Sequence, residues 1–434
     1  MKKFLALILA LVMALSLVAC GGNSGAQGEG DGDAATGSVY YLNFKPEAEE
    51  AWQALAKTYT EQTGVPVKVV TAASGEYETM LVSEMDKDGA PTLFQCNEGG
   101  VATWGDFCYD LSDSAVYNEL ASKDYALKNA DGEVISIAYC LETYGIIVNK
   151  ALLEQAGHSL DEITDFDSLK AVADDIHARA GELGFDAFTS AGLDGSSSWR
   201  FSGHLANMPL FYEFRDDGVS SKPATIKGTY LDNYKKVWDL YITDSATTGA
   251  ALLTATGDQA EAEFGEGKAV FYQNGTWEYS NLTEKFGMNP DDLTMIPIYC
   301  GVEGEEQAGL CTGTENYWSV NKNAKEEDIK ATLDFLYWVV TSEEGTSMMA
   351  EQFGACPFNS SKAPSNPFSA LANEYVANGC YPVTWAFNYT PAVNDWRAAV
   401  VDALSKYTAG NGSWDDVKTA FVEGWATQYA NENA

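Results

Sequence analysis

The side chains that usually carry enzymatic or metal chemistry are either scarce in this chain or too abundant to be informative. Its 434 residues include three histidines, His158, His177 and His204, too few for a convincing catalytic triad or zinc cluster. No G-x-S-x-G, H-E-x-x-H, G-x-x-x-x-G-K-[ST] or G-x-G-x-x-G motif occurs. The 63 acidic residues make many carboxylate pairs by chance, so a glycosidase pair has no distinctive signature. We therefore predict no catalytic residue, no metal site and no cofactor.

Cysteine is the other reactive side chain, and eight occur. Cys20 belongs to an N-terminal segment described below. The body contains the other seven: Cys96, Cys108, Cys140, Cys300, Cys311, Cys356 and Cys380. An odd number cannot pair fully within one chain, and no C-x-x-C spacing occurs. We expect mostly free, buried thiols, with Cys300–Cys311 as the first disulfide to test.

The charge balance narrows the class of ligand. The formal net charge is −37, with 46% hydrophobic and 12% aromatic residues. That much apolar side chain excludes a disordered acidic chain, and the length allows two sizeable cores. Phosphate binding requires clustered Lys and Arg, so nucleic acid and an anionic membrane surface are poor partners. A neutral or cationic ligand is expected.

The first residues have the pattern of an export signal. Lys2 and Lys3 precede an apolar run over 4–19 that is too short for a mature membrane span. Leu17-Val18-Ala19-Cys20-Gly21 resembles the bacterial lipobox, which predicts a lipidated Cys20 on the outer face of the cytoplasmic membrane. An ordinary signal peptide cleaved nearby is the alternative. Both interpretations place the mature protein outside the cytoplasm, with residues 1–20 as signal and 21–38 as a flexible linker.

The body begins with alternating strand and helix patterns. Trp52, Leu55, Ala56 and Tyr59 recur at helical spacing, and Gly64 supplies a stop. Strands are expected over 39–44, 65–70 and 92–96, with helices after Pro46 and over 77–86. This order favours a parallel α/β sheet.

Further along the chain, Glu142-Thr143 separates two apolar strands, and helices then dominate. We expect strands over 135–139 and 144–148, a strand, turn and helix over 268–282, and helices over 166–181, 229–243, 326–341, 393–408 and 414–430. Trp52, Phe335, Tyr337 and Trp338 lie among apolar neighbours at helical spacing, so they are assigned to the core.

Several segments, in this order and spacing, resemble the extracellular solute-binding proteins of carbohydrate ABC importers (family 1, maltose-binding-protein-like). They are ALAKTYTEQTGVPVKVV with SGEYE (74–78), GAPTLFQCNEGG (89–100), IAYCLETYGIIVNKALLEQAG (137–157), FGEGKAVFYQNGTWEYSNL (264–282) and KEEDIKATLDFLYWVVTSEEG (325–345). The resemblance implies an α/β, two-lobed periplasmic-binding-protein-like fold of type II, with discontinuous lobes joined by hinge segments. Lobe 1 would take 39–142 plus 312–356, and lobe 2 would take 143–311 plus 357–434.

The resemblance also implies an interlobe ligand site. Aromatic faces pack on the C–H face of a pyranose, and planar amides, carboxylates and guanidinium groups pair with its hydroxyls. Trp277 matches a ligand-stacking position and Glu142 a hinge carboxylate; capping of the next helix and a solvated loop acid are the competing interpretations. Other candidates follow strands or occupy polar and aromatic loops: Asn43, Asn97, Glu98, Trp199, Arg200, Glu278, Glu315, Asn316, Trp385, Asn388 and Trp396.

These observations lead to one hypothesis and three alternatives. The protein is expected to be a monomer that binds a sugar or oligosaccharide by hinge closure. It would deliver this ligand to ABC permease subunits while a lipid holds it at the membrane. The first alternative is the same fold with a polyamine or other organic cation as ligand. The others are a secreted carbohydrate-active enzyme that uses acids such as Glu142 and Glu278, and a glycan-binding surface adhesin.

Overall fold

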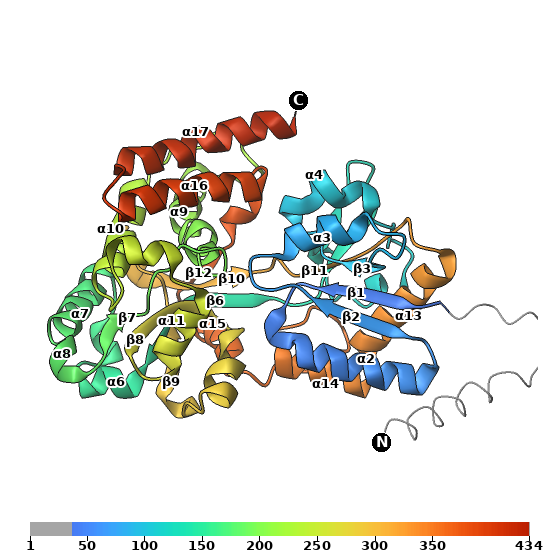
Figure 1. Ribbon diagram of the computed structural model, residues 1–434, viewed down its shortest axis with the longest axis horizontal. Helices are drawn as coiled ribbons and strands as arrows, with labels where there is room; N and C mark the ends of the chain where they lie inside the picture. The colour runs from blue at the N-terminus through green and yellow to red at the C-terminus, as the bar shows by residue number, and fades with distance from the viewer. Residues whose placement is uncertain (1–36, 434) are drawn as a thin grey trace, which may run out of the picture. The chain divides into compact units, whose positions relative to one another are not determined.

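The computed structural model describes residues 37–433 and contains two separate six-stranded sheets (Figure 1). The predicted signal peptide, Cys20 and residues 21–36 of the predicted linker lie outside the described residues. The first sheet has the order β2 (Val67–Thr71), β1 (Val39–Asn43), β3 (Leu93–Phe94), β11 (Tyr317–Val320), β5 (Val134–Ala138) and β4 (Ala126–Lys128). The second has β12 (Tyr381–Thr384), β10 (Ala308–Gly313), β6 (Glu142–Asn149), β8 (Ala269–Gly275) and β7 (Asp186–Phe188), with β9 (Leu293–Ile296) paired to β6.

Helices cover the faces of both sheets. Those that pack with the first sheet are α2 (Glu49–Thr63), α3 (Tyr77–Met85), α4 (Val101–Trp104), α5 (Ala115–Asn118), α13 (Glu326–Thr341) and α14 (Glu343–Gln352). Those on the second sheet's side are α6 (Lys150–Gln155), α7 (Phe166–Ala178), α8 (Ala180–Leu183), α9 (Asn207–Asp217), α10 (Leu231–Thr243), α11 (Gly257–Gly265), α12 (Glu278–Ser280), α15 (Phe368–Ala377), α16 (Val393–Thr408) and α17 (Trp414–Glu432). No helix in residues 37–433 is both long and apolar enough to span a membrane.

Each sheet is buried on both faces, which explains the continuous apolar runs of its strands. In β1, Tyr41 packs into one cluster of buried residues and Leu42 into another. In β6, Ile146 and Ile147 likewise enter two different clusters. None of these four clusters draws buried residues from both sheets. The fold therefore has two independent cores, one around each sheet.

The strand directions correct part of the sequence prediction. β1 pairs in parallel with β2 and β3, as predicted from the alternation of strands and helices. The prediction of a parallel sheet is wrong for the rest, because β11 pairs antiparallel with β3 and β5, and β4 pairs antiparallel with β5. β4 and β5 follow each other with no helix between them, and β11 belongs to the segment that returns from the second sheet, so these strands do not follow the local βαβ rule.

The predicted helices are mostly confirmed, with two corrections. α13 and α16 have the predicted bounds, whereas the helix expected over 166–181 ends at Ala178 and α8 follows it. Tyr337 was assigned to the core but is 40% exposed. On α13 it lies about 200° around the helix from Phe335, which is fully buried, so it faces solvent.

The chain crosses between the sheets three times: between β5 and β6, between β10 and β11, and between α14 and α15. The lobe boundaries predicted at 142/143 and 311/312 fall inside β6 and β10. The residue-level division into lobes remains a prediction. All seven cysteines in residues 37–433 are free thiols, five of them buried, and Cys300 is not bonded to Cys311.

Candidate functional site

A buried ion pair joins the loop after β1 to the first residue of β6. The Lys45 ammonium lies 2.6 Å from Glu142 Oε1 and 3.3 Å from Glu47 Oε1. Asn316 Nδ2 donates to the other Glu142 oxygen at 2.6 Å. Lys45 and Glu142 are only 6% and 5% exposed. Burial alone would lower the pKa of Lys45, but the charges of Glu142 and Glu47 outweigh it and raise the pKa above its usual value.

Local turns hold the members of this group in place. Asn43, the last residue of β1, accepts from the Lys45 backbone N–H at 3.0 Å and donates to the Lys45 carbonyl at 2.7 Å. This Asx-type turn directs the chain after the strand. Thr314 Oγ1 accepts from the Asn316 N–H at 2.9 Å in the crossing between β10 and β11. Asn43, Glu142 and Asn316 were all predicted from the sequence, and the structure brings them together.

Aromatic side chains from the second sheet's side face this polar group. Trp277 lies between β8 and α12, with its ring 6.0 Å from Trp199 and 5.4 Å from His204. His204 in turn lies 5.7 Å from the ring of Trp385. The Lys45 ammonium lies 5.3 Å from the centre of the Trp277 ring, within cation–π range. Trp277 is therefore the point at which the aromatic group meets the ion pair.

The remaining polar candidates form separate hydrogen bonds and an ion pair in the loops near this network. The Tyr317 hydroxyl donates to Glu98 at 2.7 Å, and Arg397 lies 3.4 Å from Glu315. Asn388 Nδ2 donates to the Thr314 carbonyl at 3.1 Å, which ties the loop after β12 to the second crossing. The Asn97 side chain caps the turn 98–100 by accepting from the Gly100 N–H at 3.1 Å. A Cβ on Gly99 would lie 2.7 Å from the Val393 side chain, so the loop after β3 approaches the start of α16 closely.

Two sequence candidates lie behind the site. Arg200 is 1% exposed and donates to the Ser190 carbonyl and to Ser197 Oγ, so it holds the segment after β7 in place. Trp396 is fully buried in the core of that sheet, and its indole donates to the Phe421 carbonyl at 2.9 Å. Both side chains stabilise the scaffold around the site.

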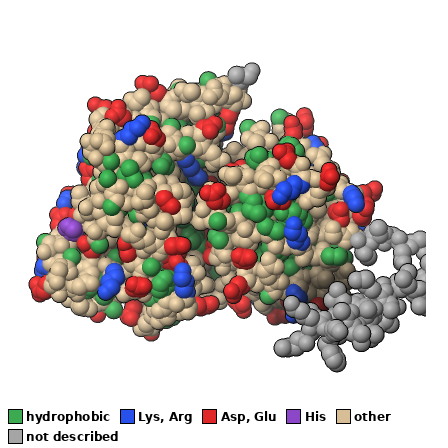
Figure 2. Space-filling view, viewed as in Figure 1, with side chains coloured by type: hydrophobic (Ala, Val, Ile, Leu, Met, Phe, Trp, Pro, Cys, Tyr) green, Lys and Arg blue, Asp and Glu red, His purple; other side chains and the backbone are tan. Residues whose placement is uncertain are grey.

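Burial suppresses much of the site's charge. It raises the pKa of Glu278 to about 8, helped by the nearby charge of Glu261, and raises the pKa of Glu98 to about 7. The pKa of the fully buried His204 lies well below its usual value because of burial and the charges of Arg397 and Lys45. Figure 2 shows acidic side chains scattered over the surface. The site therefore carries less negative charge than its number of carboxyl groups would give.

Several buried polar atoms of the site have no partner among residues 37–433. They include His204 Nδ1, Trp385 Nε1, Asn316 Oδ1, Asn388 Oδ1 and Arg397 Nε. An unpaired buried donor or acceptor costs about 1–3 kcal/mol, so their concentration here is unfavourable for stability. Donors and acceptors are both present, which suits a partner that can both accept and donate.

Comparison with known proteins assigns the fold to a family. A family model described as bacterial extracellular solute-binding protein matches residues 54–375. The chain belongs to this family. The family is one of solute-binding proteins rather than enzymes.

Solved structures share the two-lobed fold of this solute-binding protein at low sequence identity. One described as a chitin oligosaccharide binding protein has a TM-score of 0.70 at 16% identity, covering 91% of this chain and 100% of its own. RafE in complex with raffinose has a TM-score of 0.69 at 17% sequence identity, and the match covers 88% of this chain and 98% of RafE. The GacH receptor of Streptomyces glaucescens was solved unliganded and with acarbose. It has a TM-score of 0.68 at 18% sequence identity, and the match covers 91% of this chain and 99% of the receptor.

Sequence reasoning missed Lys45 and Glu47, and it treated His204 as an ordinary surface or core residue. Lys45 had a usable signal: it follows Asn43 at the carboxyl end of a buried strand, where ligands of open α/β sheets bind. His204 had none, because it reaches the site through the π-helical segment Arg200–Leu205. Its ring stacks 4.0 Å from Tyr144 of β6.

The ion pair predicts a strong thermodynamic coupling. Lys45→Met and Glu142→Gln should each lower the free energy of unfolding by about 3–5 kcal/mol, because each leaves the other charge of the pair buried without its partner. The double variant should lose clearly less than the sum. The matched control is the exposed pair Lys57–Glu61, for which the same substitutions should cost at most about 0.5 kcal/mol. Urea unfolding measures all of these, and additive effects in the Lys45 and Glu142 cycle would contradict the assignment.

The raised pKa of Glu278 predicts a pH dependence of stability. Between about pH 4.5 and 8 the unfolded chain has lost this proton while the folded chain still holds it, so raising the pH favours unfolding. Glu278→Gln should remove this contribution, worth up to about 1.4 kcal/mol per pH unit, and should gain stability relative to the wild type as the pH rises. Melting temperatures measured from about pH 5 to 8, with exposed Glu50→Gln as control, test it. Parallel curves for wild type and Glu278→Gln would refute it.

Proposed function

We propose that the protein binds a sugar or oligosaccharide between the loops of its two sheets and delivers it to an ABC permease. The observation that carries this proposal is the half-buried Trp277 ring, which lies between other aromatic side chains and the Lys45–Glu142–Asn316 network. An aromatic face beside planar hydrogen-bonding groups suits the C–H face and hydroxyls of a pyranose.

The electrostatics favour a neutral ligand over a polyamine. Lys45 pairs with Glu142 and Glu47, and Arg397 pairs with Glu315, so each of these three acids already has a basic partner. Glu278 is mostly protonated at neutral pH, and the position beside Trp277 that an organic cation would take already holds the Lys45 ammonium. The large negative charge of the chain is therefore a surface property, and a cationic ligand gains little from it in the site.

The unpartnered buried atoms support a hydroxylated ligand. A sugar hydroxyl both donates and accepts, so it can pair with Asn316 Oδ1 or Asn388 Oδ1 as acceptors and with Trp385 Nε1 as donor. The proteins of similar fold are described with raffinose, stachyose or acarbose, which are all polyhydroxylated. Both observations point to several ligand hydroxyls at this position.

The proposed contact set revises the sequence candidates. Trp396 and Arg200 are left out because they are buried behind the site. Asn43 is left out because it positions Lys45, and Glu278 because it is buried and accepts from Asn274. Lys45 and His204 are added. The proposed contacts are Lys45, Asn97, Glu98, Glu142, Trp199, His204, Trp277, Glu315, Asn316, Trp385 and Asn388.

Ligand entry requires the crossings to move. Lys45 already contacts the Trp277 ring, and Gly99 lies against Val393, so the facing loops touch in this structure. Opening would occur at the crossings after β5 and β10 and before α15. A sugar that contacts both faces would then stabilise the closed arrangement by its differential affinity.

Attachment to the membrane through Cys20 completes the proposal. It rests on the Leu17-Val18-Ala19-Cys20 pattern and on membership of an extracellular family. The full chain expressed in a lipoprotein-processing bacterium should be found in the membrane fraction and carry a lipid, and Cys20→Ala should abolish both. A wild-type chain recovered without lipid would overturn this part alone.

The ligand proposal is tested by calorimetry over raffinose, stachyose, chito-oligosaccharides and malto-oligosaccharides, with spermidine as the cationic arm. At least one sugar should bind with a Kd near the micromolar range, about −8 kcal/mol, with little dependence on salt. Trp277→Ala should weaken that binding by roughly 10- to 100-fold through lost ring contact. Tyr337→Ala on the outer face of α13 is the matched control and should change nothing.

Three outcomes would contradict the proposal. Salt-sensitive binding of spermidine without sugar binding would favour the organic-cation alternative. Sugar binding unaffected by Trp277→Ala would place the ligand elsewhere. Chromatography of the recovered ligand checks for turnover, and hydrolysis products would favour the carbohydrate-active enzyme.

A further inference from the structure

Two of the three crossings between the sheets pair with each other beside the site. The Leu141 N–H donates to the Ala355 carbonyl at 2.7 Å, and these residues form an isolated antiparallel bridge. Gly354 makes this approach possible, because a Cβ there would lie 2.1 Å from the Leu141 carbonyl oxygen. The bridge fixes the register of the two segments, so the residue before Leu141 lies opposite the residue after Ala355.

Those two residues are Cys140 and Cys356. Next to a hydrogen-bonded antiparallel pair comes a non-hydrogen-bonded pair, whose Cα atoms lie about 4.5 Å apart with side chains on the same face. A disulfide requires Cα atoms about 4.4–6.8 Å apart. Both side chains pack with the same cluster of the first sheet, and both are free thiols. The register and the shared cluster thus make the two thiols neighbours, and Cys356 is among the groups whose charge acts on the pKa of Cys140.

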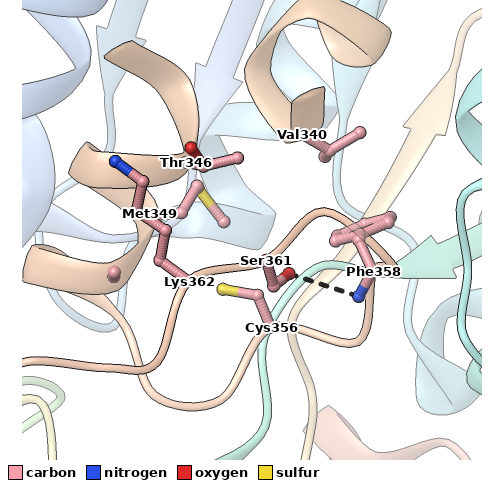
Figure 3. A pocket seen from close by; sticks show the side chains of 8 residues that line it. Val340, Thr346, Met349, Cys356, Phe358, Ser361 and Lys362 are labelled. Carbon is pink, nitrogen blue, oxygen red and sulfur yellow. Dashed lines mark hydrogen bonds between the residues drawn. The ribbon is translucent and has the colours of Figure 1, made fainter. Parts of the chain in front are cut away.

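Cys356 is the less buried of the two cysteines. Cys140 is fully buried, whereas Cys356 is half-buried and lines a small pocket of about 10 Å³ with residues of α13, α14 and the segment after them (Figure 3). Met349, Ser361 and Lys362 are among the other side chains at this pocket. A thiol-reactive molecule would therefore meet Cys356 before Cys140 once the residues around the pocket move apart.

We propose that Cys140 and Cys356 form an oxidation site, in which a low-molecular-weight disulfide converts the two thiols into a disulfide that joins two of the crossings. The Cys356 thiolate attacks one sulfur of the oxidant and expels one oxidant thiolate, which forms a mixed disulfide. The Cys140 thiolate then attacks Cys356 Sγ and expels the second. The two cysteine protons end on the two released oxidant thiols, so the protein loses two electrons and the oxidant gains them.

The surroundings make this exchange slow and base-dependent. Burial raises the pKa of Cys356 to about 12, and burial together with the charge of Glu142 raises the pKa of Cys140 well above its usual value. Since the thiolate is the attacking form, the rate should rise about tenfold per pH unit below these values. The reduced pair is therefore stable to brief exposure and responds to sustained oxidation.

The consequence follows from where the bond would form. Cys140 lies two residues before Glu142, so the bond would fix the first crossing against the third at the edge of the candidate site. It would also close a long loop in the unfolded chain, which stabilises the folded state. The oxidised protein should therefore have a higher Tm and stiffer crossings. This inference does not depend on the identity of the solute.

The test uses the full chain, first reduced, then incubated with oxidised glutathione at about pH 8.5 under native conditions. Free thiols are then alkylated, and digested peptides are analysed by mass spectrometry. A peptide pair that joins Cys140 to Cys356, lighter by two hydrogen atoms and released by dithiothreitol, is expected, with a reversible rise in Tm. Three results would overturn the proposal. They are recovery of both cysteines in alkylated form, a stable glutathione adduct on Cys356, and a disulfide between Cys140 and another cysteine.

Matched variants separate this pair from the other thiols. Cys356→Ser, at a half-buried position, should fold normally and lose both the cross-linked peptide and the Tm rise. Cys300→Ser, which removes a buried thiol of the second sheet, should keep both. A Tm rise that survives in Cys356→Ser, or that disappears in Cys300→Ser, would contradict the assignment.

Discussion

The contact on which the rest of the site depends is the buried ion pair between Lys45 and Glu142. Two charges with side chains less than a tenth exposed are tolerated only when they pair closely and their other hydrogen-bonding capacity is met. Glu47 and Asn316 meet part of it, and the Asn43 turn directs the chain that carries Lys45. The loop after β1 is thereby tied to the start of β6, where the chain passes from one sheet to the other. The same ammonium approaches Trp277, so one residue links the first sheet, a crossing and the aromatic group.

This arrangement gives each class of residue a distinct physical task. The two cores are independent, so the sheets can change their relative position by bending the crossings without repacking either interior. The aromatic rings supply apolar contact area, and the unpartnered buried atoms supply unmet hydrogen-bonding capacity. Carboxyls held neutral by burial keep an acidic protein from presenting an acidic site. A solute therefore meets a surface whose chemistry differs from that of the protein exterior.

The sequence predicted the parts of the fold that follow from local pattern. Helix periodicity gave α13 and α16 their bounds, and strand alternation identified β1, β2 and β6. It missed β4, β7 and β9 to β12, most of which have only three or four residues and pair with strands distant in sequence. At the site, the predicted Glu142, Asn316 and Trp277 lie together because each follows or begins a buried strand. Trp396 is a tryptophan like Trp277, but its side chain is buried in the core. His204 belongs to the site because a π-helical segment places it there. Side-chain direction of this kind depends on tertiary packing.

The account's central claim is that the solute lies against Trp277. Fluorine NMR of the protein labelled with 5-fluorotryptophan tests it most directly, with the Trp277 resonance assigned from a Trp277→Phe variant. A sugar that raises the Tm should shift the Trp277 signal at saturation and leave the signals of the fully buried Trp52 and Trp318 unchanged. A stabilising sugar that leaves the Trp277 resonance in place would contradict the account.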